Sequence, residues 1–265
     1  GERSRASMLA RSSAASPNLA ARVVLMTSVA TPRPPRVLFM HGLESGAFGS
    51  KARWLSERFE TAAPDQQVSA YNPLRRNGPM AACLAYVFSF GAAARYAGGS
   101  IGLSVAGLAS AGLVPFLQWR MRVAMRRCVA LMEVALRREK PDVVVGSSWG
   151  GAVALKCIEQ GYWAGPAVLL APAISARGVW NLAWPSFEPE LPAAAAARVL
   201  VVQGDRDDTV PFERVVDLCR RKGLRLEVVE GGDHRLVGAM LGPTERLAQL
   251  VRDEYQSSAP SPSIS

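Results

Sequence analysis

A serine stands between two glycines in the pentapeptide Gly146-Ser147-Ser148-Trp149-Gly150, and this spacing suits nucleophilic chemistry. Three valines, 143–145, precede it, and a run with helical character, 151–158, follows it. Strand, tight turn and helix in this order are typical of a nucleophile elbow, which presents a serine hydroxyl at the start of a helix. Side chains at the flanking glycines would crowd the crossing of strand and helix. We predict that Ser148 is a nucleophile; the alternative is a glycine-rich turn with a chance serine.

A serine hydroxyl needs a base, and the chain offers only His41 and His234. His41 ends the first predicted strand, where a loop usually supplies an oxyanion-binding N–H group, so we interpret this histidine as structural. His234 follows the last predicted strand, where the base of a Ser…Asp…His order belongs. We therefore predict that His234 acts as general base and then as general acid. The alternative is a loop histidine without a role.

An acid that orients His234 is expected in the acidic turn after the fifth predicted strand. Three aspartates compete there, Asp205, Asp207 and Asp208. Asp207 lies midway between the glycine that ends the strand and the valine that ends the turn, and we choose it. The other two are typical turn residues. Asp233 is adjacent to the histidine in sequence, so its side chain is poorly placed to orient the ring.

Two backbone N–H groups, those of Leu43 and Trp149, are predicted to form an oxyanion hole. Losing one such donor typically costs on the order of 3 kcal/mol of transition-state stabilisation. We predict neither a cofactor nor a metal. The four cysteines are widely spaced and form no C-x-x-C motif, so a structural zinc site is disfavoured. Free, mostly buried thiols in a reducing compartment are expected.

The elements that must position these residues alternate along the chain between strand-like and helix-like patterns. Strands are predicted at 36–40, 68–72, 143–145, 167–170, 198–203 and 225–229. Helices are predicted at 50–59, 120–140, 151–160, 212–222 and 235–254. Most of the strands are continuous apolar runs, which indicates an α/β fold with a mostly parallel sheet and helices on both faces. The candidate site residues all follow strands, at the sheet edge where such folds place their sites.

An apolar insert at residues 80–119 interrupts the alternation, because Arg95 is its only charged residue. Twenty-two helical residues would span about 33 Å, enough for a bilayer core. Several arginines follow from Arg120 onward, as they do at the flank of a membrane segment. We predict that the insert is helical and acts either as a membrane hairpin or as a hydrophobic lid over the site. Of the two, we favour membrane contact.

The segment 1–35 is rich in Arg, Ser and Ala and nearly free of acids, as mitochondrial and chloroplast transit peptides are. The alternative is a disordered segment. Residues 255–265 are predicted to be a disordered tail, which leaves one domain at 36–254. The expected location is intracellular, with mitochondrion, chloroplast and a membrane surface as candidates.

The net charge of +9 is concentrated in two stretches, 1–36 and 118–140, each with a net charge of +5. The rest of the chain is almost neutral, and aromatic residues are not interleaved with the arginines. This distribution disfavours nucleic acid as a partner.

These motifs together resemble the α/β-hydrolase superfamily from about residue 36 to 254, apart from the insert. Within it, four motifs are similar to the bacterial YqiA-like esterases and to the mitochondrial acyl-protein thioesterase and acyl-glucuronide esterase group. The motifs are His41-Gly42-Leu43-Glu44-Ser45-Gly46 with Ser50-Lys51-Ala52, the pentapeptide with Gly151, Gly204-Asp205-Arg206-Asp207-Asp208-Thr209-Val210-Pro211 and Asp233-His234-Arg235-Leu236. The resemblance implies a cofactor-free serine esterase with a Ser-Asp-His triad.

The function expected from the residues and the resemblance is a serine hydrolase that cleaves carboxylic esters or thioesters through an acyl-enzyme on Ser148. Its partner would be a small-molecule acyl ester or thioester. One alternative is a membrane-associated lipase or phospholipid acyl hydrolase. The other is a non-catalytic module of the same fold, with the insert as an anchor.

Overall fold

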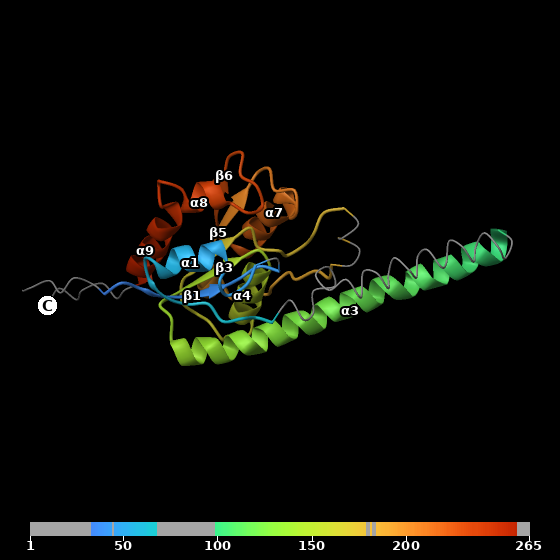
Figure 1. Cartoon of the computed structure of the whole chain (residues 1–265), viewed down its shortest axis with the longest axis horizontal. Coiled ribbons are helices and arrows are strands. Elements are labelled where there is room, and N and C mark those ends of the chain that lie inside the picture. The colour runs from blue at the N-terminus through green and yellow to red at the C-terminus, as the bar shows by residue number, and fades with distance from the viewer. Residues whose placement is uncertain (1–32, 44, 68–98, 179–180, 182–183, 259–265) are drawn as a thin grey trace, which may run out of the picture. The chain divides into compact units, whose positions relative to one another are not determined.

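A parallel six-stranded sheet forms the centre of the computed structural model, with the strand order β2-β1-β3-β4-β5-β6 (Figure 1). The structure describes residues 33–43, 45–67, 99–178, 181 and 184–258, with the side chains of 99–113 excepted. Its strands are β1 Arg36–Met40, β2 Glu60–Ala62, β3 Val143–Ser147, β4 Ala167–Leu170, β5 Val199–Gly204 and β6 Arg225–Val229. All five neighbouring pairs are parallel. The sequence prediction of an α/β fold with a parallel sheet is confirmed.

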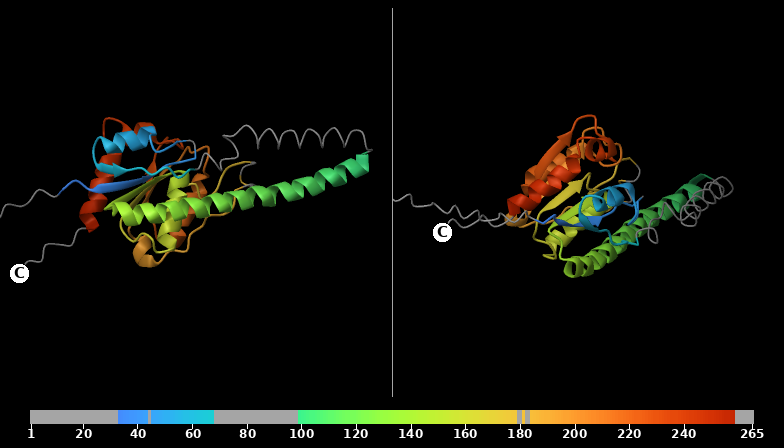
Figure 2. Two further views of the ribbon diagram at one scale, coloured as in Figure 1. Left: turned by 60° about the horizontal axis from the view of Figure 1, so that its bottom comes forward. Right: turned by 60° about the vertical axis from the view of Figure 1, so that its left-hand side comes forward.

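Helices cover both faces of this sheet, as predicted (Figure 2). They are α1 Ser50–Ser56, α3 Gly99–Glu139, α4 Trp149–Glu159, α6 Ala193–Ala196, α7 Phe212–Lys222, α8 Val237–Leu241 and α9 Arg246–Ser258. Alternate strand residues point to opposite faces, so Val144 packs with α3, α4 and α7, whereas Val143 and Val145 pack with α1, α8 and α9. The apolar strands are thus buried on both sides. The chain from residue 34 onward forms one unit, and residues 1–33 are assigned to another.

The second strand differs from the sequence prediction. We predicted a helix to Phe59 and a strand at 68–72, but the helix α1 ends at Ser56 and the strand β2 begins at Glu60. The predicted strand at 68–72 lies outside the described residues. Strand β2 is a three-residue edge strand with a polar composition, paired only with β1 among the described strands. A strand so short and so little buried has no apolar run to reveal it.

The helix predicted to begin at Arg120 begins instead at Gly99 and continues unbroken to Glu139. It therefore includes residues 99–119 of the predicted insert, whereas residues 80–98 lie outside the described part of the chain. Pro115 lies inside the helix, where it removes one backbone hydrogen bond without ending the helix. No residue near 120 is of a type that ends a helix, so residues 99–119 of the predicted insert and the helix predicted from Arg120 belong to one element.

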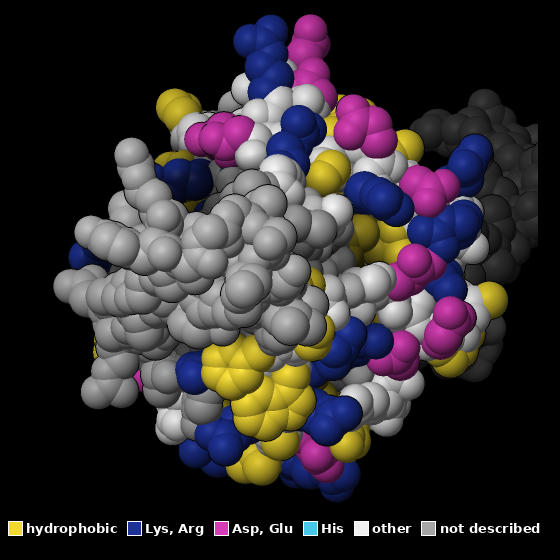
Figure 3. All heavy atoms as spheres, turned by 90° about the vertical axis from the view of Figure 1, so that its right-hand side faces the viewer, with side chains coloured by type: hydrophobic (Ala, Val, Ile, Leu, Met, Phe, Trp, Pro, Cys, Tyr) yellow, Lys and Arg dark blue, Asp and Glu magenta, His cyan; other side chains and the backbone are white. Residues whose placement is uncertain are grey.

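Neither proposed role of the insert, lid or membrane hairpin, is supported by the described residues. None of the helices there has an apolar stretch of the length that a membrane crossing requires. On the surface that Figure 3 shows, exposed hydrophobic side chains lie beside Lys and Arg side chains. Phe116 and Trp119 are two of the exposed large hydrophobic residues in the described part of α3, at 49% and 58% exposure. Contact of this segment with a membrane surface stays a prediction.

The final predicted helix, 235–254, is two helices, α8 and α9. Gly242 and Pro243 lie between them, and Pro243 cannot donate the backbone hydrogen bond that a continuous helix requires. Helix α9 then continues to Ser258, four residues into the segment that we predicted to be a disordered tail. Residues 259–265 lie outside the described part of the chain.

Candidate active site

Ser148 lies in a strained turn between β3 and α4, with φ of 54° and ψ of −117°. The turn is fixed by main-chain hydrogen bonds: Ser148 N–H donates to Leu170 O at 2.8 Å, and Ser148 O accepts from the N–H groups of Gly151 and Ala173. A positive φ costs a residue with a side chain on the order of 1–3 kcal/mol, so the surrounding packing must impose it. The strand, turn and helix that the sequence predicts are all present.

Both glycines of the pentapeptide are required by close packing. A Cβ atom added to Gly150 would lie 2.0 Å from Met40 O, and one added to Gly146 would lie 2.8 Å from Gly150 O. Contacts under 3.0 Å between a Cβ and backbone atoms are not tolerated without movement of the backbone. The two glycines therefore let the start of α4 pack closely against the ends of β3 and β1. This packing places the serine at the carboxyl edge of the sheet.

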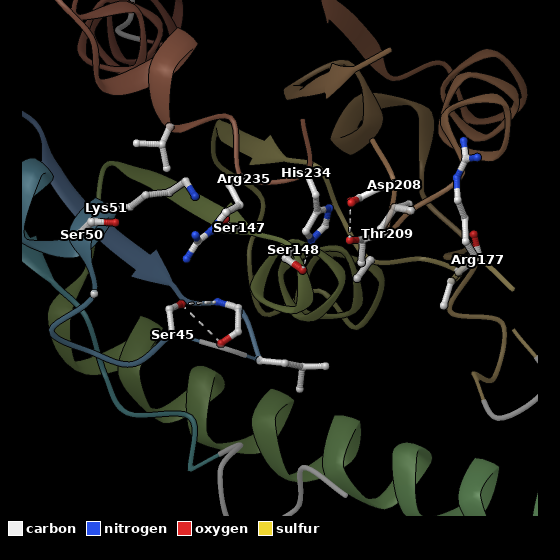
Figure 4. A pocket seen from close by; sticks show the side chains of 18 of the residues that line it. Ser45, Ser50, Lys51, Ser147, Ser148, Arg177, Asp208, Thr209, His234 and Arg235 are labelled. Atoms are coloured by element: carbon white, nitrogen blue, oxygen red, sulfur yellow. Dashed lines mark hydrogen bonds between the residues drawn. The ribbon is translucent and has the colours of Figure 1, made fainter. Parts of the chain in front are cut away.

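Ser148, His234 and Asp207 form one hydrogen-bonded row, although they come from three different strand ends. His234 Nε2 lies 2.9 Å from Ser148 Oγ, and His234 Nδ1 lies 2.9 Å from Asp207 Oδ2. Figure 4 shows the imidazole directed toward the serine hydroxyl. Because an ionised carboxylate only accepts hydrogen bonds, Nδ1 carries the proton and Nε2 is free to accept from the hydroxyl. The imidazole is thus in the tautomer that can take the serine proton.

Asp207 is the only one of the three competing aspartates that reaches the histidine. Its side chain is fully buried, and its Oδ1 accepts hydrogen bonds of 2.8 Å from the N–H groups of Thr209 and Val210. Burial, the largest single influence, favours the neutral acid, but the hydrogen bonds from His234, Val210 and Thr209, with the electrostatic attraction of the imidazole, outweigh it and hold the Asp207 pKa below its usual range. Asp205 instead accepts from Gly231 N–H, and Asp208 from the Thr209 hydroxyl.

Sequence reasoning missed Gln203, which is fully buried at the end of β5. Its amide Nε2 donates to Asp207 Oδ2 at 2.8 Å, the same oxygen that faces His234. Gln203 therefore helps to fix the rotamer of the acid. The signal was available in principle, because a polar residue in an otherwise apolar strand next to a candidate acid needs a buried partner.

Trp149 anchors the elbow through its side chain, a role that the sequence did not suggest. Its indole is fully buried, packs edge-on against Trp184 and Phe187, and donates from Nε1 to the sulfur of Cys128 at 3.5 Å. These contacts hold the first turn of α4, and with it Ser148, against the core. The helix start is fixed by this packing, since no side chain caps it.

His41 is buried and hydrogen-bonded away from Ser148. Its Nδ1–H donates to Gly42 O at 2.9 Å, and its Nε2 accepts from Gln66 N–H at 3.2 Å. The side chain of Gln66 in turn donates to His41 O at 3.0 Å. Both ring nitrogens are therefore engaged in holding the loop after β1 to the chain beyond β2, which agrees with the structural role that we expected.

The loop after β1 lies directly over the nucleophile. A Cβ atom on Gly42 would be 3.2 Å from Ser148 Cβ and 3.8 Å from its Oγ. Leu43 follows in this loop and lines the cavity above the serine. Within the described part of the chain, the N–H groups of Leu43 and Trp149 donate to no acceptor. Among the described residues, both predicted oxyanion donors are thus without an acceptor, one directly after Ser148 and one in the loop above it.

A cavity of about 720 Å³ opens at the row of three residues. Ser148 and His234 lie in its wall, together with Leu43 and Trp184. The described charged residues that line it are Lys51, Arg177, Asp208 and Arg235. A volume of this size accommodates a small organic substrate.

No group of three or more metal-ligating side chains is present among the described residues. Cys128, Cys157 and Cys219 are free and buried, as expected, while Cys83 lies outside the described part. Burial raises the pKa of Cys157 and of Cys219 to about 12, so these thiols stay protonated and unreactive.

The fold is shared with solved structures, one of which is named a hydrolase, although the sequences are distant. No protein-family model and no curated protein matches the chain. A protein from Xanthomonas campestris pv. campestris, provisionally named a hydrolase of the alpha/beta superfamily, is similar with a TM-score of 0.51 and 17% identity, over 84% of this chain and 98% of that chain. The ydeN gene product from B. subtilis is similar with a TM-score of 0.53 and 12% identity, over 84% and 99%. At these identities the likeness shows the fold alone.

Proposed function

We propose that this chain is a serine hydrolase that cleaves carboxylic esters or thioesters through an acyl-enzyme on Ser148. The observation that carries the proposal is the hydrogen-bonded row from Ser148 Oγ through His234 to Asp207, with both distances at 2.9 Å. The superfamily named for one of the similar folds is consistent with it. A module without catalytic function would have no need to keep a strained serine aligned with a base and a buried acid.

The proposed reaction begins with attack of Ser148 Oγ on the acyl carbonyl, while His234 Nε2 takes the hydroxyl proton. Asp207 stabilises the imidazolium that forms. The N–H groups of Leu43 and Trp149 donate to the oxyanion of the tetrahedral intermediate. When this intermediate collapses, His234 gives the proton to the leaving alcohol or thiol. Water then attacks the acyl-enzyme, with His234 again as base, and the carboxylic acid is released.

The chemical test is covalent labelling of the wild-type protein by a fluorophosphonate probe, which phosphonylates an activated serine. We expect one adduct, located by peptide mapping on Ser148, and turnover of short p-nitrophenyl esters and of matched thioesters. A protein that folds but neither reacts with the probe nor turns over any of these substrates would refute the proposal. The ratio of ester to thioester turnover then identifies the preferred substrate class.

The role of Asp207 is tested by Asp207→Asn. We expect kcat to fall by about three to four orders of magnitude, because an amide no longer stabilises the imidazolium and favours the wrong tautomer. Asp205→Asn is the matched control, since Asp205 is exposed and its carboxylate accepts only from the Gly231 N–H among the described residues. Equal losses in the two variants, measured as kcat on one p-nitrophenyl ester, would contradict the assignment.

A further inference from the structure

The cavity beside Ser148 carries an uneven distribution of charge. Among the described residues that line it, three side chains are cationic, Lys51, Arg177 and Arg235, and one is a carboxylate, Asp208. Figure 4 shows Lys51 and Arg235 together on one side of Ser148, and Arg177 with Asp208 on the other. One end of the cavity therefore holds two cations, while the opposite end holds one cation and one anion.

Lys51 and Arg235 form no ion pair or side-chain hydrogen bond with the described residues, in contrast to most other cations of the unit. Lys51 is half-buried at the start of α1, and Arg235 follows His234 in the loop before α8. Placing two cations together at the wall of a cavity is unfavourable in the empty protein, because each repels the other and Lys51 is partly desolvated. Such a pair is stabilised when an anion lies between them.

Among the described residues, no carboxylate forms an ion pair with Lys51 or Arg235 at this end of the cavity. Burial is the main cause that lowers the Lys51 pKa to about 8, repulsion by Arg235 is the second, and attraction by Asp233 is a smaller opposing effect. Asp233 is exposed, and its Oδ1 accepts a hydrogen bond from Leu236 N–H instead. At Lys51 the repulsion by Arg235 thus outweighs the attraction of Asp233, the acid nearby among the described residues.

We propose that Lys51 and Arg235 form a subsite that binds an anionic oxygen group, a carboxylate or a phosphate, on the substrate that Ser148 attacks. This proposal rests on the proposed function, since it names the substrate class of the same cavity. The planar guanidinium of Arg235 provides a paired hydrogen-bond donor and Lys51 a point charge, a combination that suits such groups. The hydroxyl of Ser50 lies in the same part of the wall and offers a further donor.

The anionic group is carried either by the acyl chain or by the leaving group, and matched ester pairs distinguish the two. The first pair is the p-nitrophenyl half-ester of adipic acid and its methyl ester, with the charge on the acyl side. The second pair is 4-acetoxybenzoate and its methyl ester, with the charge on the leaving group. In at least one pair we expect wild-type kcat/KM to favour the anionic ester by about tenfold or more, equivalent to about 1.4 kcal/mol. A neutral preference in both pairs would overturn the proposal.

Two variants locate the effect. Lys51→Met with Arg235→Gln is expected to remove most of the anionic preference, chiefly through KM, whereas Arg177→Gln at the opposite end keeps it. If the double variant does not fold, Arg235→Gln alone replaces it in the same measurement, because Arg235 is exposed and its replacement should leave folding intact. An equal loss of preference in Arg177→Gln would show a general effect of cavity charge and would refute the subsite.

Titration of Lys51 gives an independent readout. Lysine is charged below its pKa, so the anionic preference should fall as pH rises from 7 to 9.5 through the Lys51 pKa of about 8. Among the described residues, the charged and titratable groups that face Lys51 are Arg235, Asp233 and, in the cavity, His234. The ratio within an ester pair cancels any change at His234, because both esters depend on the same base. A ratio that stays constant over this range would contradict a role for Lys51.

Binding without turnover separates this proposal from the proposed function. The adipic half-ester of methanol and its neutral dimethyl ester are titrated by calorimetry into the Ser148→Ala protein, alone and with Lys51→Met/Arg235→Gln. We expect about tenfold tighter binding of the half-ester when the acyl chain carries the anion, and of 4-acetoxybenzoate over its methyl ester when the leaving group carries it; either difference is lost with the two cations. If the wild type hydrolyses no ester but either difference is present, the subsite stands and the hydrolase proposal fails. Equal binding within this pair, and likewise within the pair of 4-acetoxybenzoate and its methyl ester, would refute the subsite whether or not the protein is a hydrolase.

Discussion

Replacing Ser148 by alanine is expected to lower kcat for the best ester substrate by a factor of about 10⁶. Losses reach this size when a nucleophile is removed that acts together with its base. His234→Ala should cost about as much, because the serine hydroxyl loses the only acceptor within 2.9 Å among the described residues. The double variant should lose no more than either single variant. Losses that multiply instead would show that the two side chains act independently, which contradicts the proposed proton transfer.

The other histidine supplies the control for this prediction. His41→Ala removes two buried ring hydrogen bonds that hold the loop after β1, so it should lower the free energy of unfolding by about 1–3 kcal/mol. His234→Ala, in a half-buried loop, should change the unfolding free energy by less. Urea unfolding of both variants, beside their kcat values, distinguishes a structural from a catalytic histidine. The interpretation is wrong if the two variants lose activity and stability in the same proportion.

Replacing Gly150 by alanine is expected to have the largest effect on stability, a loss of more than about 4 kcal/mol in the free energy of unfolding. The added Cβ would lie 2.0 Å from Met40 O and 2.3 Å from the Met40 carbonyl carbon. These are backbone atoms of a central strand, so the clash cannot be relieved by a side-chain rotation. Either the crossing of β1 and α4 opens or the chain fails to fold.

Gly238→Ala is the matched control for Gly150→Ala. Gly238 lies in α8, and an added Cβ has no heavy atom within 4 Å. Alanine favours helix over glycine by up to about 1 kcal/mol, so this variant should be unchanged or slightly stabilised. Thermal unfolding of the purified variants, or the soluble yield if Gly150→Ala does not fold, measures the difference. Similar behaviour of the two variants would show that the crossing tolerates a methyl group.

The central strands and the row of candidate residues could be predicted because they depend on local patterns. Val143 to Val145 form a continuous apolar run, and strand ends of a parallel sheet meet at one edge, so the placement of Ser148 and His234 follows from the order of elements. Asp207 could be distinguished from its neighbours by spacing alone. The structure brings these three side chains together as the sequence predicts, while their catalytic role stays a proposal.

Features that depend on tertiary contacts could not be predicted from the sequence patterns. Strand β2 is too short and polar to be recognised, and it exists because it pairs with β1. Gln203 looks like one polar residue in an apolar strand until the structure places Asp207 beside it. Lys51 reads as an ordinary surface lysine, and only the fold places it next to Arg235 at the cavity.

The position of β6 at the margin of the sheet bears on how the protein loses activity. His234 follows β6, which pairs only with β5 among the described strands and is partly exposed. Ion pairs between Glu227 and Arg246 and between Arg225 and Glu254 tie it to α9. Edge elements open locally at a lower free energy than the core. Detachment of this one strand would withdraw the base from the serine while the other five strands stay intact, so inactivation can precede global unfolding.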